Sequence, residues 1–351
     1  MTPPRPDFSS SPNSRDPHGV NRRKFLQTAA GVAAAASLPT WASAEDGPAA
    51  TNAKPTPETL IKQLYGTFNE NQKKEICFAW DHMDPQRGLL RSRVSNNWQI
   101  TKPTIASDFY NKDQQAMIRA IFEGFYQPEW LPVIEKQLKD DAGGYGLHQS
   151  IAIFGEPGTG KFELVMTGRH LTMRADGDSA ESMAFGGPIF YGHAAQDFNE
   201  APDHPGNVYW PQALAANKVW EILDGKQRKQ ALVARTPAES SVAFRGEKGT
   251  FDGLKVGEMT ADQKAEVGKT LAKLLEPYRS TDQKEVQACL DKFGGLDGCS
   301  LAFYQQGDLG DDGVWDNWRL EGPGFVWHYR GAPHVHVWVN VSADPSVKLN
   351  A

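Results

Sequence analysis

Cysteine is scarce in this sequence, and this scarcity excludes a disulfide-rich scaffold. Only Cys77, Cys289 and Cys299 occur in 351 residues. Their number is odd and their spacing fits no zinc ribbon, so the cysteines do not indicate a structural zinc site. Cys289 and Cys299 could close one short loop as a disulfide in an oxidising compartment, whereas the apolar surroundings of Cys77 indicate a buried, unreactive thiol.

Two common catalytic signatures are also missing. No G-x-S-x-G motif occurs, so a serine hydrolase lacks its usual nucleophile turn. The segment GEPGTGK has the spacing of a phosphate-binding loop, but Phe162 follows Lys161 where magnesium binding needs Ser or Thr. The next residues, FELVMTG, alternate as in a half-buried strand and begin no helix. We therefore interpret GEPGTGK as the turn of a β-hairpin rather than a nucleotide site.

Long hydrophobic runs are absent after the N-terminal segment. No later stretch approaches the roughly 20 apolar residues of a membrane helix, so we expect a soluble mature protein without a transmembrane segment. Paired Arg22 and Arg23 precede a weakly hydrophobic, alanine-rich stretch and an A-x-A cleavage site that ends at Ala44. These features predict a twin-arginine export signal over residues 1–44, with the twin-arginine export machinery as a partner. The mature protein would then be periplasmic or extracellular.

Positive charge is in deficit once this segment is removed. Five of the 37 basic residues and two of the 43 acidic residues lie in the first 44 positions, so the remainder carries a formal net charge of −9. Such a balance disfavours nucleic acid and anionic membranes as partners.

Helical and strand patterns divide the mature chain unevenly. Residues 45–57 contain three prolines and no apolar period, which indicates a flexible lead-in. Residues 58–351 are expected to form a single domain, mainly helical over 58–142 and mixed with the sheet over 143–351. The expected helices are 56–68, 113–126, 131–141, 213–223 and 260–278, and the expected strands are 147–154, 162–168, 169–175, 182–185, 300–306, 325–331 and 334–340. This order predicts an α+β fold in which a helical N-terminal part packs with an antiparallel sheet.

The closing strand pattern carries an H-x-H motif. His334 and His336 lie two residues apart, so their side chains point to the same side together with Trp338, and the intervening valines cover the other side. The valines suffice to explain a buried strand. Two adjacent imidazoles on the second face are a common way to present two metal ligands.

Other candidates can be placed near this pair. His170 would lie on the inward face if a strand ran from Phe162 without a bulge, although Gly168 could mark a bulge that reverses this. His328 is one strand earlier than the H-x-H pair, and Glu321 is the nearest carboxylate that could complete or orient the cluster. The three histidines 170, 334 and 336 could together hold a metal, perform acid–base chemistry without one, or only form structural hydrogen bonds.

A second polar region is the Gly- and Pro-rich segment 186–210. It contains His193, Glu200, Asp203 and His204, which could serve a site or could only cap the loop backbone. The tryptophans near the C-terminus, including 315, 318, 327 and 338, could line a cleft for a sugar or an apolar ligand, or could fill the core.

These motifs resemble a bacterial family known as domain of unknown function 3500. The resemblance covers most of the mature chain, from YGLHQSIAIFGEP through ELVMTGRHLTMRADG to WRLEGPGFVWHYRGAPHVHVWVN. The family pattern G-H-H-L is matched by 168–171, so that only its second histidine, His170, carries over, and the closing H-x-H corresponds to 334–336. In the R-I-H-S-P-like turn of the family, Glu321 replaces the histidine. The resemblance implies no established activity, but it places the same three histidines in family motifs.

The leading hypothesis is an exported protein with a divalent-metal site. His170, His334 and His336 would be ligands, with Glu321 or His328 as a fourth ligand or a supporting group; zinc or copper suits such a site and iron is not excluded. A metal-activated water would support hydrolysis, and redox chemistry is the other option; Arg174 or Arg169 would bind an anionic substrate group. The alternative is a non-catalytic protein that binds a small molecule or saccharide.

Overall fold

The chain folds as α+β, as the sequence predicts. A computed structural model describes residues 55–194, 203–308 and 313–348, and in these ranges eight helices accompany an 11-stranded sheet. The predicted export signal and residues 45–54 of the predicted lead-in lie outside the described residues. Among the helices of the described ranges, none has the length and apolar character needed to cross a membrane.

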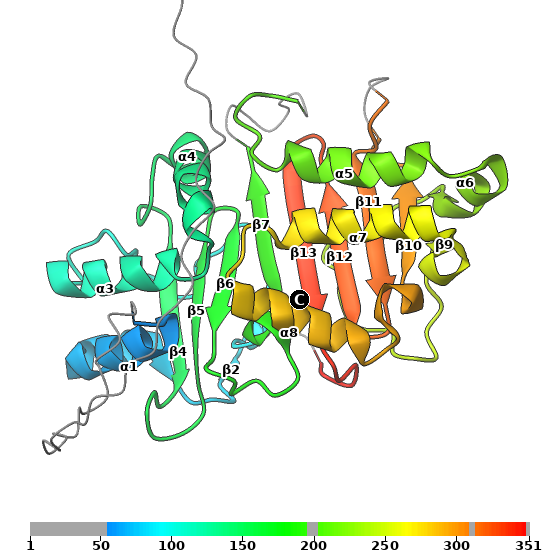
Figure 1. Cartoon of the computed structure of the whole chain (residues 1–351). Coiled ribbons are helices and arrows are strands. Elements are labelled where there is room, and N and C mark those ends of the chain that lie inside the picture. Colours follow the sequence, from blue (N-terminus) through cyan, green and yellow to red (C-terminus); the bar gives the residue numbers. More distant parts are fainter. Residues whose placement is uncertain (1–54, 195–202, 309–312, 349–351) are drawn as a thin grey trace, which may run out of the picture. The chain divides into compact units, whose positions relative to one another are not determined.

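The large sheet consists of two antiparallel meanders that meet in its middle (Figure 1). One meander contains β4 to β7, the other contains β10 to β13, and β7 pairs antiparallel with β13 at the junction. Short parallel pairs extend the edges, β1 with β4 and β8 with β10, so the sheet is mixed although its central strands are antiparallel. The strands are β1 Cys77–Phe78, β2 Met83–Asp84, β3 Gly88–Leu89, β4 Ser150–Gly155, β5 Phe162–Gly168, β6 Leu171–Ala175, β7 Ile189–His193, β8 Leu232–Val233, β9 Leu254–Lys255, β10 Ser300–Tyr304, β11 Asn317–Gly322, β12 Phe325–Arg330 and β13 Val335–Val341.

Helices cover one face of this sheet. In Figure 1, α5, α7 and α8 cross the meander that contains β10 to β13, and α1, α3 and α4 lie on the other meander. The helices are α1 Pro57–Thr67, α2 Glu70–Ile76, α3 Lys112–Glu123, α4 Leu131–Ala142, α5 Trp210–Glu221, α6 Gly225–Ala231, α7 Ala261–Leu275 and α8 Ser280–Asp291. Capping boxes begin two of these helices, from Asn111 and Gln114 at α3 and from Thr260 and Gln263 at α7.

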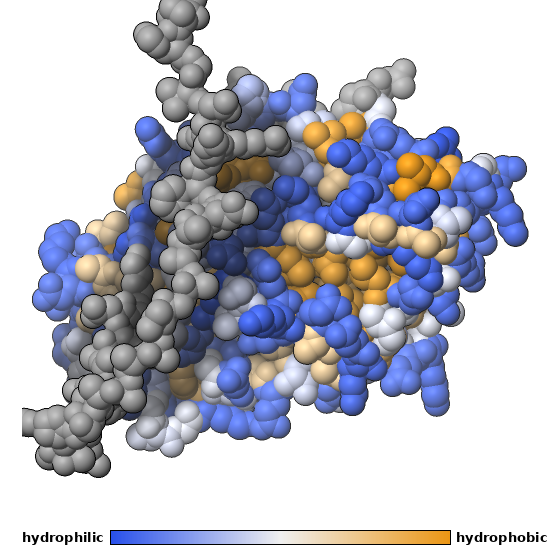
Figure 2. All heavy atoms as spheres, viewed as in Figure 1, coloured by the Kyte–Doolittle hydropathy of each residue, from blue (hydrophilic) through white to orange (hydrophobic). Residues whose placement is uncertain are grey.

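The helix-covered face holds the main hydrophobic core. Ile61 of α1, Ile121 of α3 and Leu274 of α7 join the valines of β13 in one buried cluster. Figure 2 shows the consequence at the surface, where hydrophilic residues coat the outer sides of the helices and hydrophobic residues gather between α7 and α8. Burial of these amphipathic faces accounts for the position of the helices.

Long loops cover the opposite face of the sheet. The segment between β3 and α3 brings Val94, and the segment between β8 and β9 brings Val242, into a smaller cluster with Phe190 and Trp338. Asn340 of β13 donates from Nδ2 to the Val242 carbonyl at 2.9 Å and ties the second loop to the sheet. We call this side the loop-covered face; it carries His336.

Several local expectations are confirmed and others are wrong. GEPGTGK is the turn of the β4–β5 hairpin, as predicted, and Gly155 has a φ of +72° there. Gly168 does not mark a bulge. It is the last residue of β5 and pairs with Leu171, and the two residues between them form a tight turn. The expected strand 182–185 is instead a short 3-10 turn, Ala184–Gly186. The segment 58–142 carries α1 to α4, and between β1 and α3 its residues are mostly non-helical.

The cysteines are free thiols, and three tryptophans near the C-terminus are buried in the core. All three cysteines are free, so Cys289 and Cys299 do not form the disulfide that the sequence allowed. Burial raises the pKa of the Cys77 thiol to about 12, which agrees with the predicted unreactive thiol. Trp318, Trp327 and Trp338 are buried in the sheet's two hydrophobic layers and therefore fill the core.

An acidic group on α8 should make stability depend on pH. Burial, and then the charges of Asp282 and Asp176, raise the pKa of Glu285 from 4.5 to about 7. The folded state binds the proton of the Glu285 carboxyl more tightly than the unfolded state does. The stability that this proton binding contributes is therefore full below pH 4.5 and is lost as the pH rises towards 7. We expect Glu285→Gln to be more stable than the native protein by about 1 kcal/mol at pH 8, with allowance for a half-buried carboxyl, and about equal at pH 4.

Urea unfolding at both pH values measures this difference. Glu276→Gln, which neutralises an exposed carboxylate at the end of α7, is the matched control and should show little change at either pH. A Glu285→Gln effect of the same size at pH 4 and pH 8 would contradict the assignment.

Candidate metal centre

Three histidine side chains converge on one point of the loop-covered face. The Nε2 atoms of His334 and His336 are 3.0 Å apart, and those of His336 and His170 are 3.3 Å apart. The ligand-capable atoms of all three lie within 4.8 Å of one another, and all three side chains are buried. The structure therefore brings together the three residues that the sequence predicted as one site.

The junction between the two meanders creates this convergence. His334 directly precedes β13, His336 is its second residue, and His336 is in register with Gly192 of β7. His170 occupies the tight turn between β5 and β6 with a φ of +48°, and its backbone N–H donates to Asn97 Oδ1 at 3.0 Å. A residue with a side chain at 192 would place its Cβ 2.3 Å from the Val335 carbonyl oxygen and 3.0 Å from His170 Cδ2, so glycine leaves space for both the β13 backbone and that ring.

Two of the three nitrogen–nitrogen distances are close to those around a bound cation. A tetrahedral site with metal–nitrogen bonds of about 2.0–2.1 Å has nitrogen–nitrogen edges of about 3.3–3.4 Å. The His336–His170 separation of 3.3 Å equals that edge, and the His334–His336 separation of 3.0 Å is slightly shorter. Lone pairs that face one another at such distances repel unless a metal ion or a proton lies between them.

Two carboxylates orient the rings from behind. His170 Nδ1 lies 2.7 Å from Asp141 Oδ2, and His336 Nδ1 lies 2.9 Å from Glu239 Oε2. If each Nδ1 carries the proton and donates it to its carboxylate, each Nε2 has its lone pair directed to the common centre. This carboxylate–histidine arrangement is the usual support of a metal-binding imidazole.

The local electrostatics keep the carboxylates ionised and His336 neutral. Burial alone would raise the pKa of Glu239, but the hydrogen bond from His336 and the charges of His336 and Arg330 lower it to about 2. Asp141 behaves alike, since burial opposes the effects of His170 and Arg169 and its pKa still falls below the ordinary value. Burial lowers the pKa of His336 to about 4, so its imidazole is neutral near pH 7, as a metal ligand must be.

Three of the other predicted site residues lie outside the cluster. His328 stands opposite Trp338 in register, and its Nδ1 accepts from Arg319 Nε at 3.2 Å. Glu321 lies two strands from β13 at the far end of β11, where Arg245 Nε is 3.2 Å from its Oε1. The two are buried polar groups of a neighbouring network and do not contact the three histidines.

Arg174 is the third predicted site residue that lies outside the cluster. Its side chain is fully buried, donates from Nη1 to Glu163 Oε1 at 3.1 Å and from Nε to the Pro188 carbonyl at 2.7 Å, and contacts further backbone carbonyls. Arg169, in contrast, belongs to the centre's support, because its Nε lies 3.0 Å from Asp141 Oδ1.

The polar segment 186–210 contributes less than the sequence allowed. His193 pairs in register with Val335, so its side chain is on the helix-covered face, and burial lowers its pKa to about 4. His204 Nδ1 accepts from the Gly206 N–H at 3.0 Å, a local cap of the loop. Glu200 lies outside the described residues.

The supporting carboxylates were not identified from the sequence. Asp141 had a detectable signal, because it is three residues after Leu138 and seven after Ile134, on the inward face of α4. A carboxylate on an apolar helix face needs a partner, and this observation would have flagged it. Glu239 lies in an irregular segment, where no periodicity indicates its direction.

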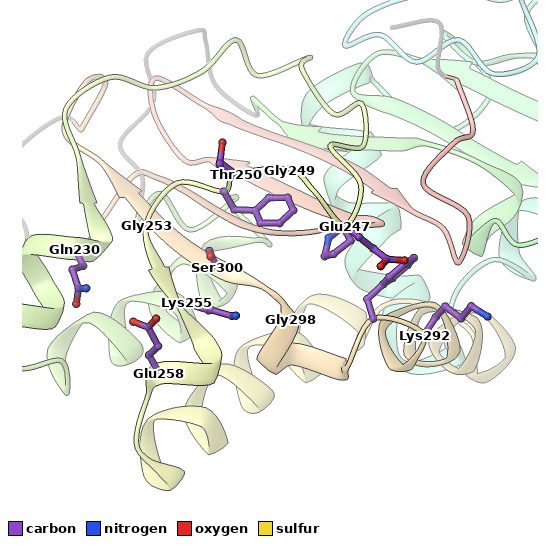
Figure 3. Close-up of a pocket in the computed structure, with 13 residues that line it drawn as sticks. Gln230, Glu247, Gly249, Thr250, Gly253, Lys255, Glu258, Lys292, Gly298 and Ser300 are labelled. Atoms are coloured by element: carbon purple, nitrogen blue, oxygen red, sulfur yellow. The ribbon is translucent and has the colours of Figure 1, made fainter.

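A pocket lies away from the three histidines. It has a volume of about 790 Å³ between the loop 247–253, β9 and the end of α8, and its charged lining residues include Lys255, Glu258 and Lys292 (Figure 3). Its lining contains no tryptophan and no histidine from the described residues. It therefore does not match the Trp-lined cleft that the alternative hypothesis requires.

Comparison with known proteins identifies the family. The sequence profile described as Protein of unknown function (DUF3500) matches residues 58–339, which include the three histidines and both supporting carboxylates. No curated protein and no solved structure matches the chain. Because the match covers most of the sequence, the chain belongs to the DUF3500 family of proteins of unknown function.

Proposed function

We propose that this protein is an exported metalloprotein that holds one divalent transition-metal ion on His170, His334 and His336. The observation that carries the proposal is the convergence of three Nε2 atoms, two of them on rings whose Nδ1 atoms face Asp141 and Glu239. A purely structural role would not require three buried imidazoles to direct their nitrogens at one point.

The ligand set favours zinc or copper. Neutral imidazole suits both metals, and iron is compatible with it. Three protein ligands leave a coordination position for water or substrate, which is the pattern of catalytic rather than structural zinc sites. We therefore propose that the centre supports hydrolysis by a metal-activated water, or redox chemistry if the ion is copper or iron.

Proton transfer at such a water would depend on the metal rather than on Glu239. This carboxylate already accepts from Trp338 Nε1 at 3.2 Å, contacts His336, and lies 3.2 Å from Arg330 Nη1. With its pKa lowered to about 2, it is a weak base. The metal's own charge would have to lower the pKa of the bound water.

The site of action is proposed from the sequence of residues 1–44. A twin-arginine signal carries folded proteins across the membrane, so the centre could be assembled before export, and the protein would act in the periplasm or outside the cell. Cleavage near Ala44 would release residues 45–351.

Elemental analysis of residues 45–351, purified without chelator or affinity tag, tests the metal. We expect near-stoichiometric zinc, copper or iron in the native protein and less than a tenth of it in a His334→Ala/His336→Ala variant, since two of the three ligands are gone. His148→Ala is the matched control, because His148 is exposed and lies outside the cluster, and it should retain the metal.

Circular dichroism and urea unfolding must show that the double variant folds. A native protein that takes up none of these ions, even after exposure to each, would overturn the proposal. Ligand-dependent tryptophan fluorescence in a metal-free protein would then support the non-catalytic alternative, the binding of a small molecule or saccharide.

A further inference from the structure

Among the described residues, the charges that support the three histidines leave a bound metal uncompensated. Each supporting carboxylate is paired with an arginine, Asp141 with Arg169 Nε at 3.0 Å and Glu239 with Arg330 Nη1 at 3.2 Å. These four charges sum to zero, and the ligating imidazoles would be neutral. A divalent ion at the centre therefore keeps its full charge within a largely buried site, and such a site favours an anionic ligand.

Arg330 is placed to bind that anion. Its Nη2 donates to the His334 carbonyl at 3.2 Å and also lies 3.4 Å from His334 Nε2, the atom that would bind the metal. When a metal occupies that nitrogen's lone pair, the Nη2 donor loses its imidazole acceptor and is left beside the metal's ligands. One Nη2 hydrogen keeps the His334 carbonyl as its acceptor, but the second is left without one. An unpaired N–H of a largely buried guanidinium is unfavourable, so an oxygen on the metal should replace the imidazole.

The guanidinium has further donor capacity. Its Nε is buried and finds no hydrogen-bond partner among the described residues. The Arg330 side chain is 19% exposed and that of Glu239 is 28% exposed, so this side of the centre reaches the surface. In contrast, Arg169 binds Asp141 from behind His170.

We propose that Arg330 anchors an oxyanion, such as a carboxylate or a phosphate, that bridges the guanidinium and the metal. The inference rests on the proposed metal centre and names the chemical class of its ligand or substrate. One oxygen of the anion would bind the metal and another would accept from Arg330, a geometry that an arginine fork favours and a single-atom anion cannot adopt.

Cobalt(II)-loaded residues 45–351 provide the test, because the visible spectrum of cobalt reports ligands at the metal. The native protein is titrated with acetate, with inorganic phosphate and with chloride, and the metal content is measured in every sample. We expect saturable spectral changes with acetate and phosphate, and affinities for both about 10- to 100-fold weaker in Arg330→Gln. Chloride would contact only the metal, so the affinity for chloride should differ by less than about 3-fold between the native protein and Arg330→Gln.

Two further variants complete the comparison. Arg119→Gln removes a positive charge from α3, outside the centre, and should leave all three affinities unchanged. Arg330→Lys keeps the charge without the fork and should weaken acetate binding less than Arg330→Gln does; it replaces Arg330→Gln if that variant loses metal.

The outcomes separate the two proposals. The Arg330 assignment would be overturned if the metal-loaded native protein showed no spectral response to acetate or phosphate. It would also be overturned if the native protein and Arg330→Gln had equal affinities for these anions. Either result would leave the metal centre intact. A native protein that takes up no cobalt would overturn both.

Discussion

Replacing Arg174 with Met is expected to lower the free energy of unfolding by about 3–5 kcal/mol, the largest stability effect predicted for a single substitution in this protein. The reason is the carboxylate of Glu163, which is fully buried and lies 3.1 Å from Arg174 Nη1. Arg91 Nη1, at 2.8 Å, would be the remaining partner of that carboxylate. Burial raises the pKa of Glu163 even with both arginines present, so losing one leaves a poorly compensated buried charge.

A double variant separates this cost from the value of the pair itself. Glu163→Leu/Arg174→Met removes both charges together, and we expect it to recover most of the stability lost in Arg174→Met. Urea unfolding at pH 7 measures all three proteins. An Arg174→Met protein as stable as the native one would show that Arg174 does not hold the sheet together, and would reopen its sequence-based assignment as an anion-binding residue.

Asp141→Asn is expected to weaken metal binding by about 10- to 100-fold. Asp141 Oδ2 faces His170 Nδ1 at 2.7 Å, and the ionised carboxylate favours the tautomer with the proton on Nδ1. An amide in its place can present its NH₂ group to Nδ1, which favours the proton on Nε2 and blocks that ligand. Competition with a chromogenic chelator measures the affinity for zinc at pH 7.

The neighbouring carboxylate supplies the control. Asp140 is on the same helix but pairs with Lys136 near the surface, so Asp140→Asn should leave the affinity for zinc within about 2-fold of the native value. Equal affinities for Asp141→Asn and the native protein would mean that His170 is not a ligand or that its tautomer is held by other contacts.

Much of the centre follows from local pattern. Alternation along β13 places His334 and His336 on one face because successive strand residues point to opposite sides. The same argument was wrong for the surroundings of His170, since Arg169 and His170 form a two-residue turn rather than part of a strand. A turn so short is difficult to recognise when neither of its residues is glycine, asparagine or aspartate.

His328 and Glu321 show why adjacency in sequence is a weak guide to a site. Both lie on strands next to or near β13 and face the loop-covered side. The register between β12 and β13 decides which β12 side chain lies beside the cluster: Arg330 is opposite His336, whereas His328 is opposite Trp338. A shift of two residues along a strand is therefore enough to replace a histidine with an arginine beside the cluster.

Local sequence pattern is enough to predict the α+β class, the helices α3 and α7, the β4–β5 turn and the common face of His334 and His336, because these depend on the geometry of neighbouring residues. Tertiary structure decided that His170 meets His336 across 166 positions, and that Asp141 and Glu239 stand behind the rings. The pairing of β7 with β13 and the docking of α4 and the 234–253 loop bring these groups together. Such long-range pairing depends on burial of whole faces, which no local period records.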